Sequence, residues 1–260
     1  MFTKAIVRPP SANFAKALTT AKLGAPHYAR ALEQHAAYCE ALERCGLTLT
    51  RLEADEQYPD STFVEDTAVL TNHGVMLTRP GAPSRIGEVE RVAEVLSQYY
   101  SELHSIHGPG TLEGGDVCET EHEGRRHFFI GISDRTNEAG VQQLAQWLAS
   151  SGCTVSFVDI RGVDNILHLK SGLAYLGENS LVVIDALADR HEFRGHDLVR
   201  VRPDDEYAAN CVRVNDHLLL AAGHPHFEAT LRDLGYETMV LETSEFQKMD
   251  GGLSCLSLRF

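Results

Sequence analysis

Cys255 is the first residue whose type and surroundings could do chemistry. It follows Asp250–Gly251–Gly252–Leu253–Ser254 and precedes the alternation Leu256–Ser257–Leu258. The two glycines allow a tight turn and the close approach of another group, and the alternation predicts a strand that begins at Cys255. A thiol held at the mouth of a strand suits nucleophilic attack. A lone cysteine is otherwise most often a small buried hydrophobe, so a catalytic reading needs support from the rest of the chain.

A thiol nucleophile needs a group that can donate a proton to the leaving group and later deprotonate water. Of the thirteen histidines, His168 is the best placed for this role, because it lies between Leu167 and Leu169. His73, His122, His191 and His196 instead fall in polar turns or loops. The alternative for His168 is a structural histidine satisfied within the core.

Carboxylates occur in two comparable places. Glu113 stands in Glu113–Gly114–Gly115–Asp116, where it could orient His168 or bind a cation. Glu65 and Asp66 follow the apolar pair Phe63–Val64, so one or both could face a cavity. Taken singly, the first stretch is also compatible with a plain turn and the second with a solvated loop.

The elements that must position these residues follow a repeated order. Each unit is predicted to open with a hairpin, continue with a helix and end with a strand. The predicted helices are Pro26–Cys45, Glu88–Tyr100, Asn137–Ser150, a weak one at Ala186–Phe193, and Pro225–Leu234. The predicted closing strands are Leu47–Leu52, Ser105–His107, Thr154–Ile160, Asp197–Val201 and Glu237–Leu241.

Five openings, at Asp66, Asp116, His168, Asn210 and Cys255, lie 50, 52, 42 and 45 residues apart. Spacings of roughly 40 to 50 residues are typical of propeller blades. A doubly wound sheet would not place a hairpin before each helix. We therefore predict a ring of five units in one domain covering residues 1–260, whose fifth unit is completed by the strand Ala5–Val7. Equivalent positions of all units would converge on a central channel.

The openings together would form an anionic pocket that contains a thiol and an imidazole. Such a pocket suits a guanidinium group, a planar cation whose N–H fork matches carboxylates. Attack by Cys255 at its central carbon would expel an amine.

Composition excludes several other classes of protein. The 37 acidic and 23 basic side chains give a formal net charge of −14, which opposes a general nucleic-acid role and weakly favours a cationic ligand. No apolar run approaches the roughly 18 residues of a membrane span, and the first residues lack the core of a signal peptide, so we expect a cytoplasmic protein without a membrane partner. The six scattered cysteines favour free thiols over a disulfide framework or zinc ribbon.

The motifs, taken together and in order, resemble the dimethylarginine dimethylaminohydrolases of the guanidine-modifying superfamily, which share a five-bladed pseudosymmetric α/β propeller, the pentein fold. The resemblance covers essentially the whole length. It rests on Leu23–Gly24, Pro59–Asp60–Ser61, Phe63–Val64–Glu65–Asp66, Thr78–Arg79–Pro80–Gly81, Ser84–Arg85, Glu113–Gly114–Gly115–Asp116, Arg135–Thr136–Asn137, Leu167–His168–Leu169–Lys170, Tyr207–Ala208–Ala209–Asn210 and Asp250–Gly251–Gly252–Leu253–Ser254–Cys255.

The resemblance implies a role for each matching residue. Cys255 would be the nucleophile, His168 the general acid and base, and Glu113 the carboxylate that positions substrate and His168. The implied substrate contacts are Asp60, Glu65 and Asp66 at the guanidinium end, Arg85 and Arg135 at the carboxylate, the backbone of Leu18 (on a lid) and of Met249 at the amino group, and Phe63. Methylated arginine would give citrulline and dimethylamine or methylamine through a thiouronium on Cys255, without metal or cofactor.

Three alternatives stay open. Deimination of arginine or another guanidine compound uses the same chemistry, but arginine deiminases carry a His-x-Asp pair where this sequence has Lys170, and usually insert a helical domain. A catalytically silent arginine-binding module would have no need of a thiol. A zinc hydrolase using Cys255 and His168 has two candidate ligands where three or four are usual. The sequence also leaves a homodimer open.

Overall fold

Five three-stranded sheets account for the strands of residues 1–122 and 124–260, the part of the chain that this computed structural model describes. Contacts divide the chain into two compact units. The terminal unit comprises Met1–Glu65 and Asn210–Phe260, and the middle unit comprises Asp66–Ala209. The prediction of a single domain over residues 1–260 stays a prediction.

All five sheets are built in the same way. A short 3-10 turn leads into a first strand, the first strand pairs antiparallel with the middle strand, and the third strand pairs parallel with the middle strand. A helical segment connects the middle strand to the third strand, as a parallel connection requires. The predicted order of hairpin, helix and strand is therefore confirmed in four of the five repeats, and in the fifth the antiparallel pair is formed by the two ends of the chain.

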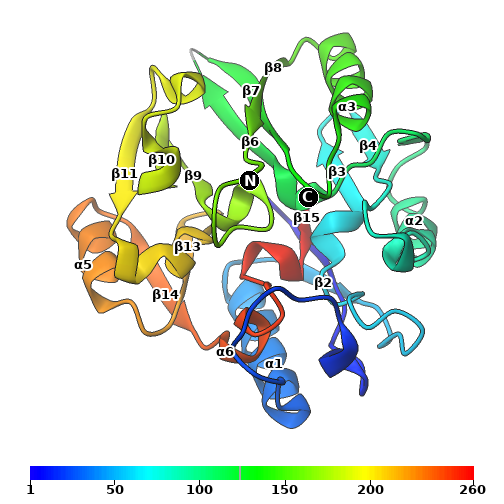
Figure 1. Cartoon of the computed structure of the whole chain (residues 1–260), viewed down its shortest axis with the longest axis horizontal. Coiled ribbons are helices and arrows are strands. Elements are labelled where there is room, and N and C mark those ends of the chain that lie inside the picture. The colour runs from blue at the N-terminus through cyan, green and yellow to red at the C-terminus, as the bar shows by residue number, and fades with distance from the viewer. Residues whose placement is uncertain (123) are drawn as a thin grey trace. The chain divides into compact units, whose positions relative to one another are not determined.

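The middle unit holds three of the sheets. Their strands are β3 (Ala68–Thr71), β4 (Gly74–Leu77) and β5 (Leu103–Ser105); β6 (Val117–His122), β7 (Arg125–Ile132) and β8 (Thr154–Asp159); and β9 (Leu173–Gly177), β10 (Ser180–Ile184) and β11 (Asp197–Val201). The connecting helices are α2 (Glu88–Leu96), α3 (Glu138–Ser150) and α4 (Asp185–Ala188). In Figure 1, α3 runs alongside the sheet of β6, β7 and β8.

The terminal unit holds the other two sheets. Their strands are β15 (Leu258–Arg259), β1 (Lys4–Val7) and β2 (Thr48–Arg51); and β12 (Val212–Val214), β13 (His217–Ala221) and β14 (Glu237–Leu241). The helices are α1 (Tyr28–Arg44), α5 (Pro225–Asp233) and α6 (Ser244–Gln247). β1 lies between β15 and β2, with Ile6 opposite Leu258, so the predicted completion of the fifth unit by the first strand is confirmed.

Four local predictions were wrong or only partly right. Strand β5 covers Leu103–Ser105 rather than the predicted Ser105–His107, and α2 ends at Leu96 rather than at Tyr100. The weak helix at Ala186–Phe193 is split into α4 and a 3-10 turn, His191–Phe193. Cys255 does not begin a strand. It lies in the 3-10 turn Ser254–Leu256, and the strand starts at Leu258.

Each of the two compact units has its own apolar core. In the terminal unit, Tyr38 and Leu42 of α1 pack with Phe14, Phe63 and Phe246, and Gly46 with φ of +90° ends this region of helix. In the middle unit, Leu144 and Leu148 of α3 pack on Phe128 and Ile130 of β7. None of the helices in residues 1–122 and 124–260 is long and apolar enough to cross a bilayer.

Candidate active site

Five of the 3-10 turns carry, or directly adjoin, the residues at the predicted openings. Asp66 lies in the turn η2 (Val64–Thr67), Glu113 directly precedes η4 (Gly114–Asp116), and His168 directly precedes η5 (Leu169–Ser171). Asn210 follows η7 (Pro203–Ala209), and Cys255 lies in η8 (Ser254–Leu256). Each of these turns stands before the first strand of a sheet, so the predicted equivalence of the openings corresponds to one repeated structural position.

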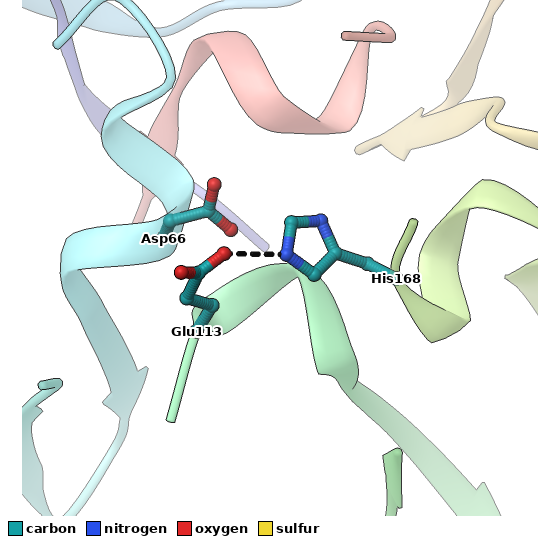
Figure 2. Close-up of side chains that lie close together, drawn as sticks. All are labelled: Asp66, Glu113 and His168. Atoms are coloured by element: carbon teal, nitrogen blue, oxygen red, sulfur yellow. Dashed lines mark hydrogen bonds and ion pairs between the residues drawn. The ribbon is translucent and has the colours of Figure 1, made fainter. Parts of the chain in front are cut away.

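Asp66, Glu113 and His168 lie close together in the middle unit (Figure 2). Glu113 Oε2 lies 2.6 Å from His168 Nε2, and both side chains are buried. Asp66 Oδ1 accepts a hydrogen bond of 2.9 Å from the Gly115 N–H. A β-carbon at Gly115 would come within 2.7 Å of His168 Nδ1 and 2.9 Å of Asp66 Oδ1, so the imidazole and carboxylate can meet only because this residue is glycine.

The carboxylates change the charge state of the imidazole. Burial alone would lower the pKa of His168, but the negative charges of Asp66, Asp116 and Glu113 and the hydrogen bond that His168 donates to Glu113 raise this pKa to about 9. Burial likewise favours neutral Asp66, but the charges of His168 and Arg85 hold the pKa of Asp66 below its usual value. At neutral pH the histidine is therefore a cation and Asp66 an anion.

Arg85 is buried among carboxylates of the middle unit. Its Nη1 donates to Asp66 Oδ2 at 2.9 Å and lies 3.6 Å from Glu113 Oε2, while Nη2 donates to Glu88 Oε2 at 2.9 Å. Burial opposes its charge, but Glu88, Asp66 and Glu113 hold its pKa well above the usual value. The arginine expected to bind a substrate carboxylate thus already serves as the counter-ion of Asp66, Glu88 and Glu113.

Arg135 differs from Arg85 in its surroundings. Its backbone N–H donates to Ser133 Oγ at 3.1 Å, and its backbone closely approaches Gly81, whose N–H donates to Glu113 Oε1 at 3.0 Å. Within the described residues of the middle unit, the Arg135 guanidinium has no acidic partner. The prediction that Arg135 binds a substrate carboxylate stays a prediction.

Cys255 is held by an ordered turn in the terminal unit. Its N–H donates to the Gly252 carbonyl at 3.3 Å, and the residue is 8% exposed. The neighbouring Ser254 N–H donates to Asn210 Oδ1 at 2.9 Å, and Ser254 Oγ donates to Glu65 Oε2 at 2.8 Å. A side chain at Gly252 would collide with the Asn210 carboxamide, so the glycine lets the turn carrying Cys255 lie against Asn210.

The remaining predicted substrate residues also lie in the terminal unit. Asp60 accepts the Leu18 N–H through both carboxylate oxygens, at 3.0 and 3.3 Å, and Leu18 itself is 39% exposed. Met249 is buried, and Phe63 is buried under Gly251 beside the rings of Phe14 and Phe246. Glu65 also lies 3.5 Å from the Arg259 guanidinium.

Sequence reasoning missed two groups in the middle unit. Glu88 was not singled out, although its position three residues after Arg85 at the start of a helix is a spacing at which ion pairs form. The hydroxyl residues Ser133 and Thr136, which bond Asp116, were also missed. Both residues lie within two positions of Arg135, and this closeness to a predicted site residue could have identified them.

A metal ion is an alternative occupant of the acidic cluster. The ligand atoms of Asp66, Glu113 and His168 lie within 4.8 Å of one another, and among residues 1–122 and 124–260 this group alone meets that criterion. One imidazole and two carboxylates would suit a divalent cation. The cationic histidine and the Glu113–His168 hydrogen bond favour a proton over a metal at this imidazole. The prediction of no metal stays a prediction.

Comparison with known proteins gives a consistent result. Residues 10–202 match the family model "N,N dimethylarginine dimethylhydrolase, eukaryotic". The chain is 41% identical, over the full length of both proteins, to the N(G),N(G)-dimethylarginine dimethylaminohydrolase of Pseudomonas aeruginosa, and 35% identical, over 98% of this chain and 96% of the relative, to that of Streptomyces coelicolor. A citrulline complex of a cysteine-to-serine mutant of the Pseudomonas aeruginosa protein superposes over the full length of both chains with a TM-score of 0.95 and 40% identity.

These similarities extend to the fold. The N-terminal domain of the cyanobacterial arginine dihydrolase ArgZ, at 20% identity, superposes with a TM-score of 0.85 over all of this chain and 97% of that domain, which shows a shared fold alone. Together with the five sheets of identical construction, the solved structures confirm the predicted fold class, a pseudosymmetric five-bladed α/β propeller of the pentein type.

Proposed function

The chain belongs to the dimethylarginine dimethylaminohydrolase family, and from this premise we propose that it hydrolyses Nω-methylated arginines to citrulline. Asymmetric dimethylarginine would release dimethylamine and monomethylarginine would release methylamine. The observation that carries the proposal is the buried Glu113–His168 pair, because a histidine kept protonated by carboxylates can give a proton to a departing amine.

The first half of the reaction forms a covalent intermediate. The Cys255 thiol loses its proton to solvent, its sulfur attacks the guanidinium carbon, and the bond from that carbon to the methylated nitrogen breaks as His168 transfers its proton to the leaving amine. The product is a thiouronium on Cys255, and His168 becomes neutral. Asp66 and Glu113 stabilise the cation before and during attack through their negative charge.

The second half regenerates the enzyme. Neutral His168 takes one proton from water, and the water oxygen attacks the thiouronium carbon. The carbon–sulfur bond then breaks as the second water proton passes to the Cys255 sulfur, which releases citrulline and restores the thiol. His168 ends protonated, as it began, with the carboxylates again stabilising its charge. Every step uses side chains of this protein and water, and we propose that no metal or cofactor takes part.

Substrate positioning is assigned to residues around these groups. Arg135 is proposed to bind the substrate carboxylate, with Arg85 contributing while it stays paired with Asp66 and Glu88. The backbone atoms of Leu18 and Met249 are proposed to bind the amino group. Asp60 would act by holding Leu18, and Glu65 by holding Ser254 beside the nucleophile. Phe63 is proposed to support this wall through Gly251.

Product analysis with two substrates tests the proposal. We expect wild-type protein to form citrulline and dimethylamine from asymmetric dimethylarginine, with little ammonia from arginine, and Cys255→Ser to lose turnover. Cys153→Ser, which alters a buried thiol of the middle-unit core, is the matched control and should remain active. Ammonia from arginine at comparable efficiency would identify a deiminase, and no product from either substrate would favour a binding module.

A chelator separates the proposed chemistry from a metal-dependent one. Because His168 and Cys255 need only proton transfer and water, turnover should persist after dialysis against EDTA. Loss of turnover, restored by a divalent cation, would instead assign the Asp66, Glu113 and His168 cluster to a metal.

A small-molecule substrate is common to all these proposals, whereas a cytoplasmic location and a homodimer stay predictions.

A further inference from the structure

The geometry of the middle unit points to Asp116 as a positioning residue that holds the backbones of His168, Glu113 and Arg135 in place for the reaction. This inference rests on the proposed function and deepens it. Asp116 does not belong to the predicted catalytic set, and its carboxylate is fully buried at the end of the turn η4. It is the group through which three separate segments of the middle unit are joined.

The first connection fixes the histidine. Asp116 Oδ1 accepts the Leu169 N–H at 2.9 Å, and Leu169 directly follows His168 in the chain. The hydrogen bond therefore holds the peptide from which the imidazole projects. Because a charged acceptor makes a stronger hydrogen bond than a neutral one, loss of the carboxylate would loosen the backbone at the proton-transferring residue.

The second connection reaches Arg135 and Glu113. Asp116 Oδ2 accepts the Ser133 hydroxyl at 2.6 Å, and Ser133 Oγ in turn accepts the N–H groups of Arg135 and Thr136, each at 3.1 Å. The Thr136 hydroxyl accepts the Glu113 N–H at 3.0 Å. The loop that carries Arg135 and the segment that carries Glu113 are thus both connected to Asp116.

The chain leaves space for this carboxylate at Gly131 of β7. A β-carbon at Gly131 would lie 2.7 Å from Asp116 Oδ1 and 3.0 Å from the Leu169 β-carbon. A larger residue would displace either the carboxylate or the segment after His168. Gly131 therefore provides the space that the Asp116 carboxylate and Leu169 occupy.

Asp116 also acts on His168 through charge. The charged groups that face His168 are Asp66 from η2 and Glu113 and Asp116 at η4, with Arg85 of the turn Pro83–Arg85 beyond Glu113. Burial raises the pKa of Asp116 above its usual value, although the charge of His168 and the hydrogen bonds from Ser133, Thr136 and Leu169 oppose this rise. The negative charge of Asp116 is in turn one of the causes that raise the pKa of His168.

The test replaces Asp116 with an isosteric neutral residue. We expect Asp116→Asn to lower kcat by about 10-fold to 100-fold while KM changes by less than about 3-fold, because the proton donor is misplaced and substrate contacts stay. The pKa of His168, followed by ¹⁵N NMR of the free enzyme, should fall by about one unit or more. The basic limb of the kcat–pH profile should shift to lower pH by the same amount.

The matched control is Asp134→Asn, which neutralises an exposed carboxylate beside Ser133 and should leave kcat and the His168 titration unchanged. If Asp116→Asn does not fold, two variants of Ser133 replace it in the test. Ser133→Ala should lower kcat, whereas Ser133→Thr, which keeps the hydroxyl, should have a kcat close to that of the wild type. A fall in melting temperature with unchanged kcat and His168 titration in these variants would overturn the inference.

The NMR readout separates this inference from the proposed function. If wild-type enzyme turned over no methylarginine, the proposed function would fail, yet the His168 titration of Asp116→Asn would still test whether Asp116 acts on the histidine. An unchanged titration together with unchanged Leu169 amide and His168 ring shifts would reject the role of Asp116 on its own. A shifted titration would support it whatever the substrate.

Discussion

His168 is a cation because three buried carboxylates surround it, and this charge has a consequence for stability. Its folded-state pKa of about 9 lies above the value of about 6.5 expected for an unfolded chain. The stabilising contribution is therefore fully present below about pH 6.5 and is lost as the pH rises through about 9. At about 1.4 kcal/mol for each pKa unit, the upper limit of this contribution is about 3 kcal/mol.

We accordingly expect the free energy of unfolding to fall more steeply with pH in wild-type protein than in His168→Gln. Between about pH 6.5 and about pH 10, the fall measured by urea denaturation should be larger in the wild type by up to about 3 kcal/mol. The comparison removes the contributions of other titrating groups, which both proteins share. Parallel pH profiles for the two proteins would show that His168 is neutral in the folded state.

Arg85 compensates buried negative charge, so its removal leaves carboxylates without a counter-ion. We expect Arg85→Ala to lower the free energy of unfolding by about 3 to 5 kcal/mol at neutral pH. Arg85→Lys should recover only part of this loss, because an ammonium cannot reproduce the guanidinium fork that meets both Asp66 and Glu88. Urea denaturation measures both effects.

The chain contains a matched control for this pair. Arg91 and Glu94 share the spacing of Arg85 and Glu88, but both side chains are more than half exposed. Arg91→Ala should therefore cost less than about 1 kcal/mol. Equal losses at the two arginines would mean that burial does not decide the energetics of these pairs.

At the scale of elements, hydrogen bonds to Asp60 and to the segment Lys248–Asp250 hold the predicted lid around Leu18. Within the terminal unit, Asp250 Oδ2 accepts the Thr20 N–H and hydroxyl, and Lys248 O accepts the Thr19 hydroxyl. Asp60 holds the Leu18 N–H. The segment after the turn Phe14–Lys16 has no regular secondary structure up to α1, so these bonds determine its position.

We expect Asp250→Asn to speed tryptic cleavage after Lys22 and to raise KM for methylarginine several-fold with a smaller effect on kcat, since the lid residue is proposed to bind substrate rather than to react. The pattern follows from weakening charge-assisted hydrogen bonds to Thr20. Asp233→Asn, at an exposed position of α5, is the control. Unchanged cleavage and KM would show that Asp250 does not fasten the lid.

At the scale of the whole molecule, the 37 acidic against 23 basic side chains attract a cationic substrate. Screening shortens the reach of this field from about 30 Å at 0.01 M salt to about 3 Å at 1 M. We expect kcat/KM for dimethylarginine to fall about 3-fold to 10-fold over this range, through KM, with kcat nearly constant. A constant or rising kcat/KM would show that long-range charge does not contribute.

The proposed catalytic residues are divided between two units. Cys255 belongs to the terminal unit, which brings both ends of the chain together in the sheet of β15, β1 and β2, whereas His168 and Glu113 belong to the middle unit. Cys255 is part of the apolar core of the terminal unit, whereas Glu113 and His168 directly precede 3-10 turns of the middle unit. The distribution follows from the repeat, because each opening contributes one chemical group and none contributes the whole set.

The amino-acid sequence by itself determined the repeat of turn, hairpin, helix and strand, and it identified Cys255, His168 and Glu113 as candidates. These features are local: apolar periodicity, glycine pairs and turn residues express themselves within a few residues of where they stand. The pairing of β1 with β15 could also be expected, because the last unit lacked strands that the first residues could supply.

Only the tertiary structure decided which side chains share their charges and hydrogen bonds. Arg85 was expected to bind substrate, yet its position among Asp66, Glu88 and Glu113 arises from packing between segments that are separate in the chain. The same holds for Asp116, whose partners Ser133 and Leu169 are 17 and 53 residues away. Burial makes these contacts energetically decisive, and burial is a property of the folded chain that local patterns do not specify.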